Sequence, residues 1–252
     1  MQDQFGLIVI GDEILKGKRR DRHFDAFREL LGERGFGLAW LQILPDDPDL
    51  LIRHLGSSMA EGVPVFCCGG IGATPDDHTR QCAARAAGVQ LIRHPGAVAE
   101  IEAQFGADAY PIRILMADLP EGSELIPNPY NRVPGFSLRD HYFLPGFPDM
   151  AHPMARWVLD RYYSEGAVPE RELALKVFGA PESTLLPLMQ QLTADYPQLK
   201  LFSLPRLGPD GFVELGFRGR DGLEPAFAAL RAGVAALGLR YELELSGTSS
   251  GP

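Results

Sequence analysis

The sequence predicts an α/β protein, in which a mostly parallel sheet has helices on both faces and a smaller α+β domain follows. Three observations predict this fold class. Residues 5–10 and 63–68 are short, wholly apolar runs, typical of strands that are buried on both faces. Segments with helical spacing of apolar residues alternate with such runs, which indicates βαβ units. The pattern changes after residues 164–169, so we expect two domains, at residues 1–165 and 170–245.

The elements of the first domain are predicted from apolar spacing and from the Gly and Pro residues that end each run. Phe24, Phe27 and Leu30 recur at helical spacing in a segment that ends near Gly35. In chain order we expect strand 5–10, helix 24–35, strand 36–44, helix 49–59, strand 63–68, helices 77–87 and 97–105, strands 136–138 and 141–144, and helix 149–163.

The second domain is predicted around a turn of sequence GPDG at residues 208–211. Proline sets φ and glycine permits positive φ in such a turn, so the flanking strands are expected to pair antiparallel. Residues 246–252 are expected to be a disordered tail. In chain order we expect strand 172–178, helix 181–196, strands 199–207 and 212–217, helix 224–237 and a last strand at 241–245.

Composition limits the classes of function. Hydrophobic residues make up 45% and charged residues 23% of the chain, which is typical of a globular protein. The net charge of −9 disfavours unspecific binding to nucleic acid or to an anionic membrane. No apolar run is long enough for a membrane span, so we expect a cytoplasmic protein with a small-molecule partner. The cysteines Cys67, Cys68 and Cys82 show neither zinc-ligand spacing nor a disulfide pattern, and are expected in the core.

Gly11-Asp12-Glu13 directly follows the first predicted strand. Ligands of open parallel sheets bind outside the carboxyl ends of the strands. Two adjacent carboxylates at such an edge can hold a hard cation or act as a general base. The alternative is a polar turn in which Asp12 or Glu13 caps the next helix.

Residues 69–79, of sequence GGIGATPDDHT, follow a buried strand and precede a helix. Glycines let backbone N–H groups approach a phosphate, and the helix N-terminus adds positive potential. Asp76 and Asp77 would repel a bare phosphate, so they fit a metal that bridges them to it. The alternative is a helix cap with an acidic first turn. The expected phosphate- or nucleotide-binding residues are Gly69, Gly70, Gly72, Ala73, Thr74 and Thr79.

Two further segments, residues 127–136 and 144–150, are dense in proline and glycine. Rigid loops at a sheet edge suit ligand binding, and ordinary turns are the alternative. We expect Asn128, Pro145 and Gly146 to shape the nucleotide or sugar side of a site.

These three motifs together resemble one family. GDEILKG, GGIGATPDDHT and PNP…PGF…LPGFPDM look like the molybdopterin-binding (MoaB/MogA-like) domain of competence/damage-inducible protein CinA, over about residues 4–160. Residues 170–245 resemble its small KH-like middle domain. The resemblance implies a MogA-like three-layer α/β/α fold and a homodimer or other homo-oligomer. The C-terminal amidohydrolase domain of full-length relatives is absent, so deamidation of nicotinamide mononucleotide is not expected.

The resemblance also implies a divalent-metal-dependent nucleotide pyrophosphatase that hydrolyses ADP-ribose or a similar nucleotide diphosphate. Asp12, Glu13, Asp76 and Asp77 are then the catalytic candidates, and Asp12, Asp76 and Asp77 would hold Mg²⁺ or another divalent cation. The alternatives are a molybdopterin-binding protein of molybdenum cofactor biosynthesis and a non-catalytic nucleotide-binding module. The chain departs from the family pattern in loops expected to line the pocket, at Ala73, Leu115, Met116 and residues 131–133.

Overall fold

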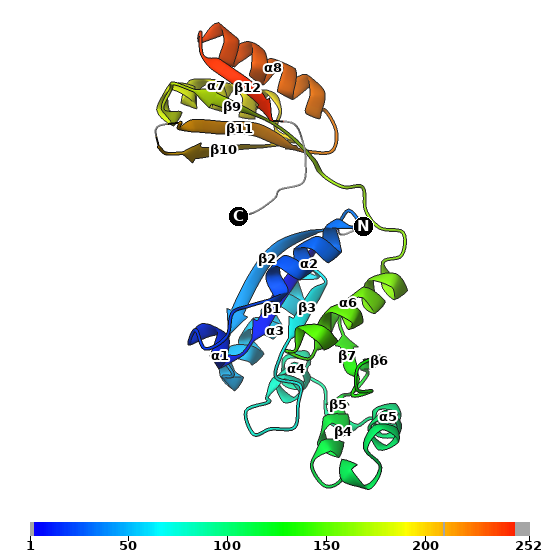
Figure 1. Cartoon of the computed structure of the whole chain (residues 1–252). Coiled ribbons are helices and arrows are strands. Elements are labelled where there is room, and N and C mark those ends of the chain that lie inside the picture. The colour runs from blue at the N-terminus through cyan, green and yellow to red at the C-terminus, as the bar shows by residue number, and fades with distance from the viewer. Residues whose placement is uncertain (1–2, 209, 245–252) are drawn as a thin grey trace. The chain divides into compact units, whose positions relative to one another are not determined.

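The structure is a computed structural model that describes residues 3–208 and 210–244 of the chain. It divides into two compact units, Met1–Ala167 and Val168–Pro252, which are described separately (Figure 1). The tail predicted at residues 246–252 lies outside the described residues.

The first unit is built on a six-stranded, mostly parallel sheet, as predicted. Four neighbouring strands run parallel, and the last two pairings, β8 with β7 and β7 with β6, are antiparallel. In spatial order the strands are β2 (Gly37–Leu44), β1 (Gln4–Ile10), β3 (Val65–Cys68), β8 (His141–Leu144), β7 (Gly135–Leu138) and β6 (Glu124–Ile126). A separate two-stranded ribbon, β4 (Leu91–Arg93) with β5 (Asp118–Pro120), lies outside this sheet.

Helices cover both faces of the sheet, which gives the expected α/β/α layers (Figure 1). Side chains of a strand alternate between the faces, so Leu7 and Val9 pack in one core while Ile8 and Ile10 pack in the other. The first core is closed by α2 (His23–Gly32) and α6 (Pro148–Tyr162), and the second by α3 (Pro48–Glu61), α4 (Thr79–Ala87) and α5 (Pro95–Phe105). The short elements are α1 (Asp12–Leu15), η1 (Gly106–Ala109) and η2 (Arg113–Ala117).

The carboxyl ends of β1, β3 and β8 meet at one edge of the sheet. β1 lies between β2 and β3 in the sheet. The chain therefore passes from β1 to β2 on one side of it, and then crosses to β3 on the other side. The backbone ties the loops together there, since Gly11 N–H donates to Leu44 O (3.0 Å) and Gly69 N–H donates to Leu144 O (3.0 Å). Such a switch point is where ligands bind in open parallel sheets.

The second unit is a four-stranded antiparallel sheet with strand order β10-β11-β9-β12. Its helices bury a separate core in which Leu175, Leu215 and Leu230 are inaccessible to solvent. The predicted antiparallel hairpin is present as β10 paired with β11. In chain order the elements are β9 (Arg171–Phe178), α7 (Glu182–Asp195), β10 (Lys200–Arg206), β11 (Phe212–Gly219), α8 (Leu223–Ala236) and β12 (Arg240–Glu244).

Two of the composition-based expectations bear on the described residues. None of the helices described here has the length and apolar character needed to cross a membrane. Cys67, Cys68 and Cys82 are buried free thiols, and burial raises the pKa of each of them.

Candidate functional site

A cavity of about 470 Å³ opens at the edge of the sheet where β1, β3 and β8 end. Its wall combines the glycine loop (residues 69–78, between β3 and α4), acidic side chains from two other segments, and apolar side chains. The lining residues are Ile10, Gly11, Glu13, Arg19, Asp46, Gly69, Gly70, Ile71, Gly72, Ala73, Thr74, Asp76, Asp77, Phe105, Met116, Asn128, Asn131, Val133, Pro145, Gly146, Phe147 and Met150.

The glycine loop is packed too closely for side chains at its first two glycines. A Cβ at Gly69 would lie 2.2 Å from the carbonyl oxygen of Ile10, at the end of β1. A Cβ at Gly70, whose φ is +66°, would lie 2.3 Å from Oγ1 of Thr79. The close approach holds the loop against both β1 and α4, with its backbone in the cavity wall.

Thr79, predicted as a phosphate ligand, lies beneath this loop and not in the cavity wall. Its hydroxyl donates to Gly69 O (2.9 Å), and its backbone N–H donates to Gly70 O (3.0 Å). Thr79 is fully buried, so both of these groups fasten the loop to the first turn of α4.

Thr74 places its hydroxyl between two carboxylates of the glycine loop. Oγ1 is 2.6 Å from Oδ1 of Asp76 and 2.5 Å from Oδ2 of Asp77, and Thr74 N–H also donates to Asp77 Oδ2 (2.9 Å). The hydrogen bond from Thr74 lowers the pKa of Asp76. A hydroxyl carries one hydrogen, so it serves only one of the two carboxylates at a time. Asp76 and Asp77 therefore carry more negative charge than the single Thr74 hydroxyl can compensate.

Acidic side chains from two other segments line the same cavity. Glu13 comes from α1, which directly follows β1, and Asp46 comes from the loop after β2. Asp46 Oδ2 accepts the backbone N–H of Asp12 (2.9 Å). Burial raises the pKa of Asp46, and the negative charges of Glu13, Asp12 and Asp76 raise it further. Asp46 was not among the predicted site residues, although it follows a strand that lies next to β1.

Asp12 does not line the cavity, unlike the other three acidic candidates. Its carboxylate forms an ion pair with Lys16, one turn further along the chain, and that contact lowers the pKa of Asp12. The structure thus brings Glu13, Asp76 and Asp77 to one cavity and directs the Asp12 carboxylate to a lysine.

The described residues contain no group of three or more His, Cys, Asp or Glu side chains that could hold a metal ion. The predicted set Asp12, Asp76 and Asp77 is therefore not gathered as a preformed metal site. Mg²⁺ commonly keeps several waters and binds through one or two carboxylates together with substrate phosphates. Asp76 and Asp77, with their excess negative charge, fit a cation of that kind that arrives with a phosphorylated ligand.

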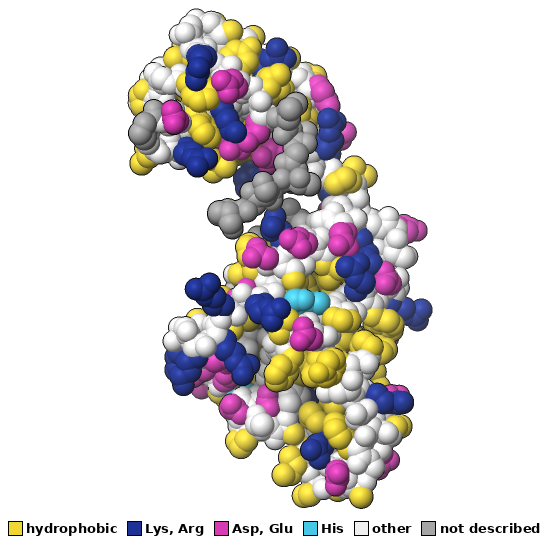
Figure 2. All heavy atoms as spheres, viewed as in Figure 1, with side chains coloured by type: hydrophobic (Ala, Val, Ile, Leu, Met, Phe, Trp, Pro, Cys, Tyr) yellow, Lys and Arg dark blue, Asp and Glu magenta, His cyan; other side chains and the backbone are white. Residues whose placement is uncertain are grey.

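A basic segment follows α1 and reaches the cavity. It carries Lys16, Lys18, Arg19, Arg20 and Arg22, and Figure 2 shows Lys and Arg side chains gathered over α1. Arg19 lines the cavity and has no ion pair or side-chain hydrogen bond within the described part of the chain. Arg19 was not among the predicted site residues.

The remaining wall comes from the proline-rich loops. Asn128 lines the cavity, but its amide donates to Asn131 Oδ1 (2.8 Å) and Val133 O (3.0 Å), and its Oδ1 accepts Tyr130 N–H (3.0 Å). Asn128 therefore shapes the loop that carries Asn131, a lining residue from the segment 131–133 that was expected to line the pocket.

The loop after β8 closes the cavity next to the glycine loop. Pro145 and Gly146, two of the predicted site residues, both line the cavity. A Cβ at Gly146 would lie 3.4 Å from the Cα of Gly69. The ring nitrogen Nε2 of His23, in α2, donates to Gly146 O (3.2 Å). Apolar side chains complete the wall: Phe105, Met116, Phe147 and Met150.

The first unit of the chain matches a known protein family. A family model described as a probable molybdopterin binding domain matches residues 6–164. A CinA-like protein of Geobacter sp. (strain M21) is 31% identical over 192 residues, which is 73% of this chain and 46% of that protein. The chain thus spans about half the length of the CinA-like relatives it matches. A protein of Archaeoglobus fulgidus is 26% identical over 218 residues, which covers 86% of this chain and 91% of that protein.

One solved structure resembles the chain over its larger part. It is the crystal structure of the protein CinA, of unknown function, from Thermoplasma acidophilum. The TM-score is 0.58 at 27% identity, and the match covers 63% of this chain and 96% of that one.

Proposed function

Because this chain belongs to the family of probable molybdopterin-binding domains and has CinA-like relatives, we propose that its cavity binds a nucleotide diphosphate and hydrolyses the diphosphate bond. The observation that carries the proposal is the composition of one cavity wall. Backbone amides of the glycine loop stand beside the carboxylates of Asp76 and Asp77, with those of Glu13 and Asp46 in the same wall.

Each part of the wall has a role in this proposal. The amides of Gly70, Gly72 and Ala73, at the N-terminal side of α4, donate hydrogen bonds to phosphate oxygens. Asp76 and Asp77 hold a divalent cation that comes with the ligand. That cation, when bound, would offset phosphate charge and lower the pKa of a water molecule.

Asp46 is the residue we assign to proton transfer. It lines the cavity, and burial raises the pKa of its carboxyl from the ordinary value for aspartate. A carboxylate with a raised pKa is a stronger proton acceptor, which suits removal of a proton from the attacking water. Arg19, which lines the cavity, adds positive charge toward the leaving phosphate.

The test is a hydrolysis screen with ADP-ribose, FAD and related dinucleotides, with Mg²⁺ or Mn²⁺ added. We expect turnover that needs the added cation and that falls by about a hundredfold or more in Asp77→Asn, as expected for loss of a charged ligand-holding group. Asp25→Asn, the same change on the exposed surface of α2, is the matched control and keeps the wild-type rate. A folded protein that hydrolyses none of these compounds contradicts the proposal.

A second candidate function rests on a different part of the same cavity. Phe105, Met116, Phe147 and Met150 give it apolar side chains, and the Asn131 side chain adds polar atoms among them. Such a surface suits a flat heterocycle, and pterin binding is what the family description names. Fluorescence of molybdopterin on addition of the protein tests this, and a Met116→Ala variant should weaken the binding.

The two candidates differ in what they require from the acidic residues. Hydrolysis requires Asp77, whereas pterin binding through the apolar wall does not. Nucleotide binding that persists in Asp77→Asn without any turnover in the wild type would favour the third alternative, a non-catalytic nucleotide-binding module.

A further inference from the structure

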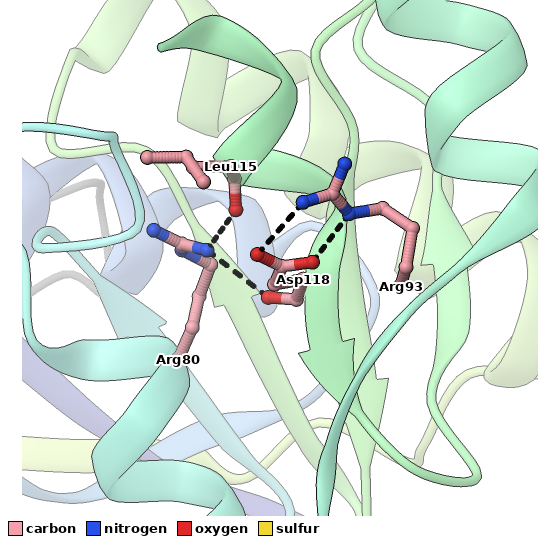
Figure 3. A network of polar contacts seen from close by, with 4 residues as sticks. All are labelled: Arg80, Arg93, Leu115 and Asp118. Atoms are coloured by element: carbon pink, nitrogen blue, oxygen red, sulfur yellow. Dashed lines mark hydrogen bonds and ion pairs between the residues drawn. The ribbon is translucent and has the colours of Figure 1, made fainter. Parts of the chain in front are cut away.

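Arg80, the second residue of α4, has only 4% of its surface exposed. Figure 3 shows its guanidinium facing the carbonyl oxygens of Leu115 and Asp118. Its Nη2 donates to Gly72 O (2.7 Å). Its Nη1 donates to Asp118 O (3.0 Å) and to Leu115 O. The guanidinium therefore joins two backbone segments that are far apart in the chain, the glycine loop and residues 115–118.

This cation sits in an electrostatically unfavourable place. The N-terminal turn of a helix carries positive potential, which disfavours a basic side chain there. Burial lowers the pKa of Arg80. The Asp118 carboxylate does not form an ion pair with Arg80, because it is held by both Nε and Nη2 of Arg93 (Figure 3). The side-chain hydrogen bonds of Arg80 all go to carbonyl oxygens, and the negative charges of Asp118 and Asp77 favour its charged form without an ion pair.

The contact with Gly72 fixes the direction of a peptide group in the cavity wall. In a trans peptide the C=O of one residue and the N–H of the next point in opposite directions. The bond from Gly72 to Ala73 is trans, since within residues 3–208 and 210–244 only Tyr110–Pro111 is cis. Because Arg80 holds Gly72 O, the N–H of Ala73 is turned away from Arg80, and both Gly72 and Ala73 line the cavity.

The contact with Leu115 reaches a second wall of the cavity. Leu115 belongs to η2, and the next residue, Met116, lines the cavity. Asp118 begins β5, which pairs with β4. One guanidinium thus sets the position of the glycine loop relative to the segment that carries Met116.

We propose that Arg80 is the positioning residue of an anion-binding site in this cavity, where it directs the Ala73 amide toward the anion and supplies positive charge behind the loop. The inference rests on the proposed function only in that the cavity binds a phosphorylated ligand. It extends that function to a buried residue that touches neither the ligand nor the solvent.

The probe is inorganic pyrophosphate with Mg²⁺, and its affinity is measured by isothermal titration calorimetry on the full chain. We expect Arg80→Met to bind it about tenfold or more weakly, as for loss of a hydrogen-bonded charge. Arg80→Lys keeps the charge but cannot reach three carbonyls in a fixed geometry, so its affinity should fall between those of the wild type and Arg80→Met.

Arg93→Met is the matched control, since it removes the same charge from the same network without touching the glycine loop. It breaks a surface ion pair, so pyrophosphate affinity should stay within about twofold of wild type. A second readout separates positioning from general stability. The amide signal of Ala73 in the two-dimensional NMR spectrum should move on addition of pyrophosphate in the wild type and Arg93→Met, and much less in Arg80→Lys.

Each outcome decides something. If folded Arg80 variants bind pyrophosphate as tightly as wild type, Arg80 does not position the site. If Arg80→Met does not fold, Arg80→Lys decides by the same two measurements. If wild type binds no pyrophosphate, the proposed function is contradicted and the inference that rests on it falls too, which differs from a loss in the variants alone.

Discussion

Replacement of Gly70 by alanine should damage both the stability of the first unit and its anion affinity. The φ of Gly70 is +66°, where an alanine side chain costs about 1–2 kcal/mol. The new Cβ would also lie 2.3 Å from Oγ1 of Thr79, which donates a hydrogen bond to Gly69 O. Displacing that hydroxyl adds about 1 kcal/mol. We therefore expect a total loss of about 2–3 kcal/mol in the free energy of unfolding.

Gly88→Ala separates the two contributions. Gly88 directly follows helix α4, whereas Gly70 lies in the loop before it. The φ of Gly88 is +68°, close to that of Gly70, but a Cβ there meets nothing within 4 Å. It should show only the backbone contribution, about 1–2 kcal/mol, with unchanged pyrophosphate affinity. Urea unfolding followed by tryptophan fluorescence measures the difference, because Trp40 and Trp157, the two tryptophans of the chain, both lie in the first unit. Equal losses in the two variants, with equal affinities for pyrophosphate, would refute the account of the glycine loop.

Three further predictions concern pH, the acidic residues and ligand binding. Burial lowers the pKa of His23 and of His141, so below about pH 6.5 the unfolded chain binds protons that the folded chain does not. The urea midpoint should therefore fall on acidification from about pH 7.5 to 5.5, and an unchanged midpoint would contradict this. Asp12→Asn should retain the hydrolysis that Asp77→Asn loses, because the Asp12 carboxylate is paired with Lys16. Equal losses of activity in both variants would show that Asp12 takes part in the site. Mg²⁺ with pyrophosphate should raise the thermal midpoint of the wild type, by mass action, and leave that of Asp77→Asn nearly unchanged. The same rise in both would show binding elsewhere.

The layered sheet and the glycine loop could be predicted because their signals are local. A wholly apolar run marks a buried strand whatever surrounds it, and consecutive glycines mark a close backbone approach. The three-residue strands β4, β5 and β6 were not predicted, since so short a run has no period to read.

The missed site residues depend on contacts between distant segments. Arg80 resembles a surface arginine at a helix start, and its burial follows from carbonyls 35 and 38 positions further along the chain. Asp46 and Arg19 follow other elements and reach the cavity because β2 lies beside β1 and α1 packs against β2. Asp12 was predicted to be a site residue but does not line the cavity, because Lys16, one helical turn away, pairs with its carboxylate.

Part of the cavity wall is also the surface of a hydrophobic core. Ile10, Ile71 and Val133 belong to the core between the sheet and helices α3 to α5, and all three line the cavity. An occupant that covers these side chains completes the packing of that core, so its affinity and the melting behaviour of the first unit are thermodynamically linked. Changes at Ile10, Ile71 or Val133 will alter recognition and rigidity together, whereas a change at the exposed carboxylate of Asp76 can alter recognition alone.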